Sequence, residues 1–318
     1  MSGEFELIAR YFTRPVRRAA LGVGDDCALL KVAPGMQLAV SCDMLVEGRH
    51  FLSTVPPDRL GHKALAVNLS DLAACGAEPL AFTLALALPR ADDRFLAPLA
   101  QGLFALADAH DIELVGGDTT AGPLNLCITV FGQVPPGQAL LRSGAKPGDD
   151  LWVSGTLGDA RLALEVFRGR VALPGGELDA VRRAMELPQP RVALGRALRG
   201  VASAAIDLSD GLLGDLGHVL QRSGVGATVD VDTLPRSSVL AAQPVALQHE
   251  CVLGGGDDYE LLFTAPPGQA AAVRAAGAAA GVAVTRCGTI TGERGLRVRD
   301  GQGRAIEVPF HSFDHFKE

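Results

Sequence analysis

The chain has 318 residues, of which 48% are hydrophobic and 20% are charged. This is enough apolar sequence for a large core, and more than one domain is expected. The formal net charge of −7 leaves no basic field to hold a nucleic-acid backbone, so nucleic-acid partners are excluded. No apolar run approaches the roughly 18–20 residues of a membrane span, and neither a signal peptide nor a membrane partner is expected.

The six cysteines include no C-x-x-C pair, which excludes zinc-ribbon and thioredoxin-like sites. Several of them lie inside apolar runs, as small buried hydrophobic residues do. A reducing, cytoplasmic location is therefore expected.

The first half of the chain alternates between helical and extended apolar patterns. Helices are predicted at 4–12, 58–75 and 93–109, and strands at 27–31, 37–43, 80–88, 112–115 and 125–134. The run 80–88 is continuously apolar and is closed by Pro89, which is typical of a strand buried on both faces. A Pro-Pro-Gly turn at 135–137 and a glycine-rich stretch at 144–148 then mark a domain boundary.

The second half has the pattern of a further α/β unit. Strands are predicted at 151–154, 204–208, 227–231 and 259–264, and helices from Gly158 and at 177–187, 190–200, 211–222 and 268–280. Three strands are expected to end the fold, the last two joined by a hairpin turn at Asp300-Gly301. The predicted domains are 1–138 and 149–318.

Acidic residues gather beside glycines at the ends of short apolar runs. The motifs are Gly-Val-Gly-Asp-Asp at 22–26, Ser-Cys-Asp at 41–43, Asn-Leu-Ser-Asp at 68–71, Gly-Gly-Asp-Thr-Thr at 116–120, Asp-Leu-Ser-Asp-Gly at 207–211 and Gly-Gly-Gly-Asp-Asp at 254–258. In α/β proteins, ligand sites form where strands give way to loops. Carboxylates that converge on one cleft repel each other unless cations lie among them, so the motifs predict a Mg²⁺ site that handles an anionic substrate.

Several other kinds of site are excluded, because no P-loop, protein-kinase signature set, G-x-S-x-G elbow or H-E-x-x-H motif occurs. What remains is a set of aspartates with nearby hydroxyls and glycines. Mg²⁺ ions held by such groups can neutralise a triphosphate and hold a second phosphate against it. Phosphoryl transfer needs little else besides alignment.

The ordered set of motifs, together with 142–148, resembles that of the thiamine-monophosphate kinases, in the superfamily of aminoimidazole-ribonucleotide synthetase and selenophosphate synthetase. The resemblance covers nearly the whole chain. It implies a two-domain synthetase-superfamily fold of the α/β (α+β) class. In that fold an N-terminal mixed sheet forms a barrel across a homodimer and binds ATP and Mg²⁺, and a C-terminal α/β domain completes the active-site cleft.

The resemblance also implies a reaction, in which the γ-phosphoryl group of ATP passes in line to thiamine monophosphate with several Mg²⁺ ions. No general base is expected, because a phosphate monoester with a second pKa near 6 is already mostly ionised at neutral pH. The implied metal ligands are Asp26, Ser41, Cys42, Asp43, Asp71, Asp118, Asp207 and Asp210. The implied ATP contacts are Gly117, Asp118, Arg142 and Ser209, and the implied thiamine monophosphate contacts are His50, Asp257 and Phe313.

Three of these positions depart from the family pattern. Cys42 stands in place of threonine, Asp257 in place of glutamate, and Phe313 in place of an aromatic residue that is often tyrosine or tryptophan. The loss of a hydroxyl at Cys42 leaves its backbone carbonyl as a ligand.

Simpler interpretations stay open for some of these residues. Asp207 and Asp210 stand at a strand-to-helix junction, where aspartate is a favoured N-cap. Asn68 and Ser70 are expected to be orienting groups or helix-face residues rather than metal ligands. A lone histidine such as His50 is often structural. Two other functions also stay open, namely a sister enzyme resembling aminoimidazole-ribonucleotide synthetase and a nucleotide- and metal-binding regulator without turnover.

Overall fold

The computed structural model describes residues 4–307, and the chain divides into two compact units. Unit 1 comprises Met1–Leu72 and Ala77–Gly137, and unit 2 comprises Ala73–Gly76 and Gln138–Glu318. Each unit has its own sheet. Within the described part of the chain, no helix combines the length and the apolar character that crossing a bilayer requires.

Unit 1 is built on a four-stranded sheet with the order β1-β4-β2-β3. Its strands are β1 (Gln37–Val46), β2 (Glu78–Leu88), β3 (Glu113–Ala121) and β4 (Asn125–Val134). β4 runs antiparallel to β1 and β2, whereas β2 and β3 are parallel because α3 (Asp93–Ala109) carries the chain back between them. The prediction of an N-terminal mixed sheet is therefore confirmed.

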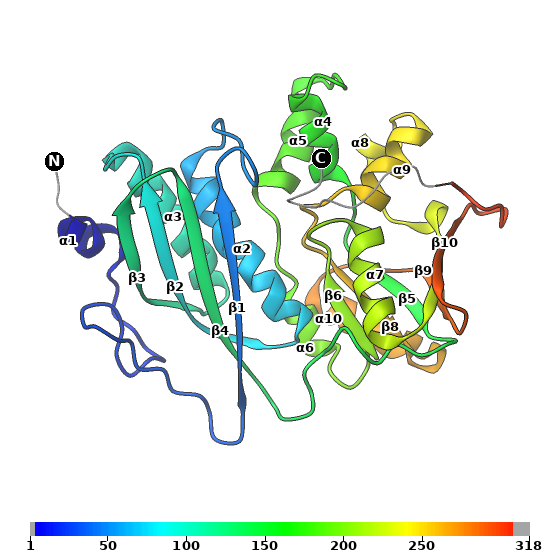
Figure 1. Ribbon diagram of the computed structural model, residues 1–318, viewed down its shortest axis with the longest axis horizontal. Helices are drawn as coiled ribbons and strands as arrows, with labels where there is room; N and C mark the ends of the chain where they lie inside the picture. The colour runs from blue at the N-terminus through cyan, green and yellow to red at the C-terminus, as the bar shows by residue number, and fades with distance from the viewer. Residues whose placement is uncertain (1–3, 308–318) are drawn as a thin grey trace. The chain divides into compact units, whose positions relative to one another are not determined.

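The two faces of this sheet differ. α2 (Pro57–Ala74) and α3 lie behind it in Figure 1, and Phe82 and Val130, which are paired in register, are fully buried. On the other face Ala85 and Met44 are exposed, and we call this the open face. The prediction that the strand 80–88 is buried on both faces is therefore wrong, because within unit 1 one of its faces is partly exposed. Alternate residues of this strand are small, and they line the open face.

The N-terminal segment differs from its prediction in one part. The helix expected at 4–12 is present as α1 (Glu4–Leu7) followed by a π-helical turn, η1 (Ile8–Phe12). The prediction of a strand at 27–31 is wrong, because this stretch makes only an isolated bridge, between Leu29 and Leu21. Its apolar side chains Ala28 and Leu30 pack against a small cluster that includes Ala81 instead of pairing in the sheet.

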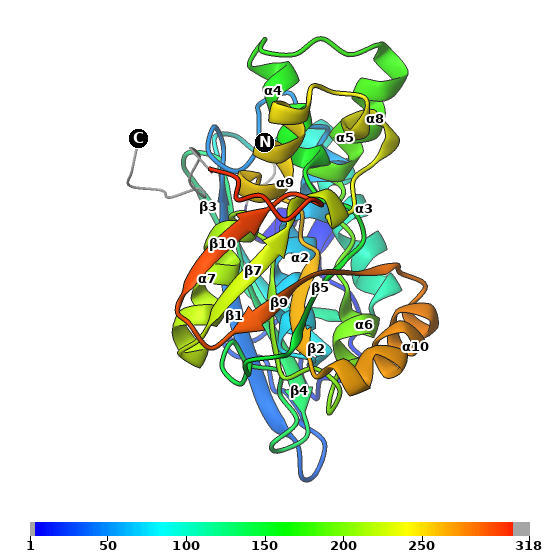
Figure 2. The same ribbon diagram turned by 90° about the vertical axis from the view of Figure 1, so that its right-hand side faces the viewer.

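Unit 2 contains a six-stranded sheet with the order β10-β7-β9-β5-β8-β6. Figure 2 shows β10, β7, β9 and β5 of this sheet side by side. The strands are β5 (Asp150–Ser154), β6 (Ala204–Asp207), β7 (Gly226–Asp230), β8 (Leu261–Ala265), β9 (Val284–Thr291) and β10 (Gly295–Arg299). The helices are α4 (Asp159–Phe167), α5 (Gly175–Glu186), α6 (Val192–Ala197), α7 (Leu212–Ser223), α8 (Ser238–Ala241), α9 (Val245–Gly254) and α10 (Ala270–Ala280), with 3₁₀ turns η2 (Val231–Thr233) and η3 (Pro267–Gln269).

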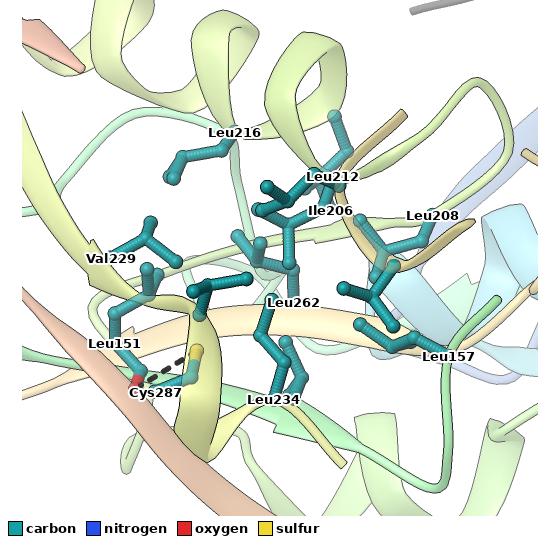
Figure 3. Close-up of a cluster of buried hydrophobic side chains, with 14 of the residues drawn as sticks. Leu151, Leu157, Ile206, Leu208, Leu212, Leu216, Val229, Leu234, Leu262 and Cys287 are labelled. Atoms are coloured by element: carbon teal, nitrogen blue, oxygen red, sulfur yellow. Dashed lines mark hydrogen bonds between the residues drawn. The ribbon is translucent and has the colours of Figure 1, made fainter. Parts of the chain in front are cut away.

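Part of the core of unit 2 lies between α7 and the sheet, and the same cluster extends to α4, α5, α8 and α9. Figure 3 shows Leu212 and Leu216 of α7 above Ile206, Val229 and Leu262 of three strands, all of them buried. This packing fixes the start of α7 against the end of β6. The loop that joins them carries candidate site residues.

Two predictions for unit 2 need correction. α8 and α9 were not predicted, because their short apolar runs lack a clear helical period. After β10 the chain turns at Asp300 but returns only as an isolated bridge between Arg299 and Ala305. The predicted last strand is therefore not found up to residue 307.

Candidate functional site

The best-defined group of predicted ligands in unit 1 lies where β1 meets α2. The Oγ atom of Ser41 donates a hydrogen bond to Oδ2 of Asp71 at 2.5 Å. Asp43 lies two residues further along β1, so its side chain is on the same face as that of Ser41. Its backbone N–H donates to Oδ1 of Asn68 at 3.0 Å. We call Ser41, Asp43, Asn68 and Asp71 the Ser41–Asp71 cluster.

Asn68 is the buried member of this cluster, with 1% of its surface exposed. While its Oδ1 accepts from Asp43, its Nδ2 donates to the carbonyl oxygen of Ala64 at 2.9 Å. Both ends of the amide are therefore held. These contacts agree with the orienting role expected for Asn68, and the group that it holds is the backbone of Asp43.

Asp43 does not end its strand and Asp118 does not lie in a loop, contrary to prediction. β1 continues to Val46, and β3 runs from Glu113 to Ala121 through the predicted loop. Strand pairing causes the extension, because β3 stays in register with β2 from Gly116 to Ala121.

Asp118 and Cys42 lie on the open face of the sheet. Asp118 is exposed and is paired with Ala85, which is also exposed. The Sγ atom of Cys42 lies 3.5 Å from that of Cys127 on β4. Burial, followed by the hydrogen bond with Cys42, raises the pKa of Cys127 to about 11. These side chains therefore point to the side of the sheet opposite Ser41, and unit 1 does not bring Asp118 into the Ser41–Asp71 cluster.

Asp26 and His50 lie on loops of unit 1. Asp26 is exposed in a turn that is closed by a hydrogen bond from the Leu29 N–H to the Leu21 carbonyl. Nδ1 of His50 accepts a hydrogen bond from the Val46 N–H at 3.0 Å, so a neutral imidazole carries its proton on Nε2. The His50 carbonyl accepts from Nζ of the buried Lys63 at 3.0 Å. His50 is thus fixed on both its backbone and its ring.

The carboxylate and hydroxyl oxygens of the Ser41–Asp71 cluster are suitable ligands for a hard cation that takes few ligands from the protein. Among residues 4–307, no three histidine, cysteine, aspartate or glutamate side chains gather closely enough to hold a metal ion. Mg²⁺ does not require such a cage, since it usually takes one or two carboxylates and completes its octahedron with water and substrate phosphate. Two carboxylates beside a hydroxyl match that donor set.

In unit 2, two loops that carry predicted site residues are joined through their backbones. The Asp257 N–H donates to the Ser209 carbonyl, and the Tyr259 N–H donates to the Leu208 carbonyl, both at 2.8 Å. A Cβ atom on Gly256 would lie only 2.4 Å from the Ser209 carbonyl, so this close approach requires glycine. The predicted ATP contact and the predicted substrate contact are therefore parts of one backbone assembly.

Asp257 has an unusual backbone conformation, with φ of 68°, as has Tyr259 with φ of 49°. Left-handed conformations at such residues cost on the order of 1–3 kcal/mol each and persist only where the surroundings impose them. The surroundings include the hydroxyl of Tyr259, which donates to Oδ1 of Asp257 at 3.1 Å. The direction of the Asp257 carboxylate is therefore set by its neighbour.

Two further carboxyl groups near these loops are not among the predicted site residues, although Asp258 ends the Gly-Gly-Gly-Asp-Asp motif. Asp215 accepts hydrogen bonds from the N–H groups of Asp210 and Gly211, both at 3.1 Å. Burial, followed by the negative charge of Asp210, raises the pKa of Asp215 to about 7. Asp258 accepts from the Gly158 N–H at 2.9 Å at the start of α4, and burial raises its pKa. The available signal for Asp215 was an acidic residue in the first turn of a predicted helix.

The remaining predicted residues are placed as follows. Asp207 is buried at the end of β6, and Ser209 and Asp210 are half-buried in the loop after it. Arg142 is exposed, and its carbonyl accepts from Oγ of Ser223 at 3.2 Å. Phe313 lies outside the described residues.

Comparison with known proteins places the whole chain in one family. Residues 24–134 match the AIR synthase related protein, N-terminal domain, and residues 146–301 match the C-terminal domain of the same family. The thiamine-monophosphate kinase of Salmonella typhimurium is 48% identical over 99% of this chain and 98% of its own length. The thiamine-monophosphate kinase of Escherichia coli strain K12 is 45% identical with the same coverage.

Solved structures agree with this assignment. The crystal structure of thiamine-monophosphate kinase from Stenotrophomonas maltophilia is 46% identical, with a TM-score of 0.85 over 94% of this chain and 95% of its own. The structure of AaThiL complexed with AMPPCP and TMP is 29% identical, with a TM-score of 0.78 over 92% of each chain. The predicted two-domain fold is therefore confirmed. The chain belongs to the AIR synthase related family and, within it, to the thiamine-monophosphate kinases.

Proposed function

We propose that this protein phosphorylates thiamine monophosphate to thiamine diphosphate, with ATP as the phosphoryl donor. The observation that carries the proposal is 45–48% identity to thiamine-monophosphate kinases over nearly the full length of both chains. The binding of AMPPCP and TMP by AaThiL, which matches over 92% of this chain, supports the same pair of substrates.

The residues of the chain bind and align the two phosphates in this proposal. Asp43 and Asp71 supply carboxylate oxygens from the Ser41–Asp71 cluster, and Asn68 keeps the Asp43 backbone in place. Asp26, Asp118, Asp207, Asp210 and the carbonyl of Cys42 are the further proposed metal ligands. When bound, Mg²⁺ supplies the positive charge that lets two anions approach each other.

The other predicted residues contact the substrates directly. Arg142 grips phosphate through its planar guanidinium group, and Gly117, Asp118 and Ser209 complete the nucleotide contacts. His50, Asp257 and Phe313 meet thiamine monophosphate. No general base takes part, because the attacking phosphate oxygen is already ionised at neutral pH. The reacting oxygen and the γ-phosphorus need only be held in line.

We also propose that the protein forms a homodimer through the open face of the unit 1 sheet. Leu38, Val40 and Met44 project from this face of β1, with 47%, 56% and 51% of their surfaces exposed. Three large apolar side chains at alternate positions of one strand favour burial against a second copy. The six free cysteines agree with the proposed cytoplasmic location.

The test is incubation of the purified protein with ATP, Mg²⁺ and thiamine monophosphate, followed by chromatography of the products. Thiamine diphosphate and ADP should appear in equal amounts, and neither should form when Mg²⁺ is chelated. Protein that binds ATP but makes no thiamine diphosphate would instead be a nucleotide-binding regulator.

A further inference from the structure

The loop between β6 and α7 begins a helix without a capping side chain. Gly211 occupies the N-cap position with φ of 112°, and a glycine offers no side-chain oxygen to the N–H groups around it. Such N–H groups at a helix start need acceptors from elsewhere. Asp215, in the first turn of α7, is the acceptor found for this loop.

Asp215 reaches back from the helix to the loop. Its Oδ2 atom accepts hydrogen bonds from the N–H groups of Asp210 and Gly211, each at 3.1 Å. The residue is 3% exposed. Two consecutive N–H groups therefore converge on one buried carboxyl group, which fixes the backbone at Asp210 and Gly211.

The opposite side of the same loop is held by backbone alone. The carbonyl oxygens of Leu208 and Ser209 accept from Tyr259 and Asp257, and the Leu208 N–H donates to the Glu260 carbonyl, all at 2.8 Å. Together with the bonds to Asp215, these bonds leave the backbone of segment 208–211 little freedom. The side chains of Ser209 and Asp210 are the proposed nucleotide and metal contacts.

We propose that Asp215 is a positioning residue, which sets the backbone from which Ser209 and Asp210 bind the nucleotide and its metal ion. In this role Asp215 does not touch either ligand. Its Oδ2 atom instead accepts hydrogen bonds from the N–H groups of the loop. The inference rests on the proposed function, because it takes Ser209 and Asp210 as ligand contacts.

The test compares Asp215→Ala and Asp215→Asn with Asp300→Ala as a matched control. Asp300 also accepts two backbone N–H groups on one oxygen, those of Gln302 and Arg304, both at 2.9 Å. The probe is Mn²⁺ with a non-hydrolysable ATP analogue, titrated by calorimetry, and each variant is checked for folding by circular dichroism.

Asp215→Ala should weaken binding of the Mn²⁺–nucleotide complex about ten- to a hundredfold, as loss of an orienting group outside the ligand set usually does. Asp215→Asn should bind with intermediate affinity because it keeps one acceptor, and it decides the question if the alanine variant does not fold. Asp300→Ala should bind as wild type does. Wild-type affinity in folded Asp215 variants, or an equal loss in Asp300→Ala, would overturn the inference. Failure of the wild type to make thiamine diphosphate would count against the proposed function, whereas the binding comparison still tests Asp215.

Discussion

Ser41 and Asp71 are thirty residues apart in sequence, yet a hydrogen bond of 2.5 Å joins the hydroxyl of one to the carboxylate of the other. Ser41 belongs to β1 and Asp71 to α2, so this bond ties a strand to the helix that follows it. It also sets the distance between two proposed ligand groups.

Ser41→Ala should lower both stability and metal affinity. Removing a hydrogen bond to a charged group costs about 1.5–3 kcal/mol, because the Asp71 carboxylate loses a partner. Urea denaturation measures the first effect, and Mn²⁺ titration measures the second. Ser53→Ala, at an exposed position, is the control and should change neither quantity. If the Ser41→Ala variant binds Mn²⁺ with wild-type affinity, the Ser41 hydroxyl does not contribute to the metal site.

Asn68→Ala should reduce turnover although Asn68 is not a proposed ligand. The variant removes the acceptor of the Asp43 N–H and the donor to Ala64, so the Asp43 backbone is no longer held. We expect a loss in kcat of about tenfold or more, as for other residues that orient metal ligands. Asn68→Asp keeps the acceptor and should recover part of the activity. Equal kcat values for both variants and wild type would contradict the orienting role.

Tyr259→Phe should affect the thiamine substrate more than ATP. The change removes only the hydroxyl that donates to Asp257 and leaves the ring in place. One lost hydrogen bond of about 1 kcal/mol predicts a rise in KM for thiamine monophosphate of about fivefold. Steady-state kinetics should show KM for ATP within about twofold of wild type. Equal rises in both constants would place Asp257 outside the substrate site.

Stability at acid pH should depend on Glu113, which holds the N-terminal segment that carries Asp26. Burial opposes ionisation of Glu113, but hydrogen bonds from the N–H groups of Arg17, Ala19 and Arg18 outweigh it and lower its pKa. A lowered pKa in the folded state means that the ionised group stabilises the fold above its ordinary pKa, near 4.5. That contribution is lost as the pH falls through the lowered value.

The measurement is the free energy of unfolding of wild type and Glu113→Gln from pH 6 downward. The variant should be less stable at pH 6, and the difference should shrink as the pH falls below 4.5, because wild type then loses the charge that the variant lacks. A difference that stays constant over this range would show that the charge of Glu113 does not stabilise the fold.

The sequence predicted the regular elements well where local pattern decides them. The predicted bounds of α3 and β4 agree with the structure to the residue, because a helical apolar period and a long apolar strand are local patterns. The strand at 27–31 was wrong because its apolar residues are used for packing rather than pairing. β3 is longer than predicted because its second half is extended by pairing with β2, which no local pattern encodes.

For the site, too, local sequence pattern predicted some features and tertiary packing decided the others. Motif residues could be named from the sequence, but their contacts depend on how distant elements meet. The bond between Ser41 and Asp71 needs β1 and α2 to pack, and the open-face position of Asp118 depends on strand register. The sequence does not identify the role of Asp215, because an aspartate in the first turn of a helix is common. No sequence signal shows that its side chain points inward.

The most direct test of the metal-assisted mechanism is the turnover of Asp43→Asn beside that of Asp58→Asn. Both changes neutralise one carboxylate of unit 1, and Asp58 lies exposed in the first turn of α2. The mechanism predicts that Asp43→Asn forms thiamine diphosphate about a hundredfold more slowly or worse while its unfolding is unchanged, and that Asp58→Asn is close to wild type. Near-normal turnover in folded Asp43→Asn would contradict it.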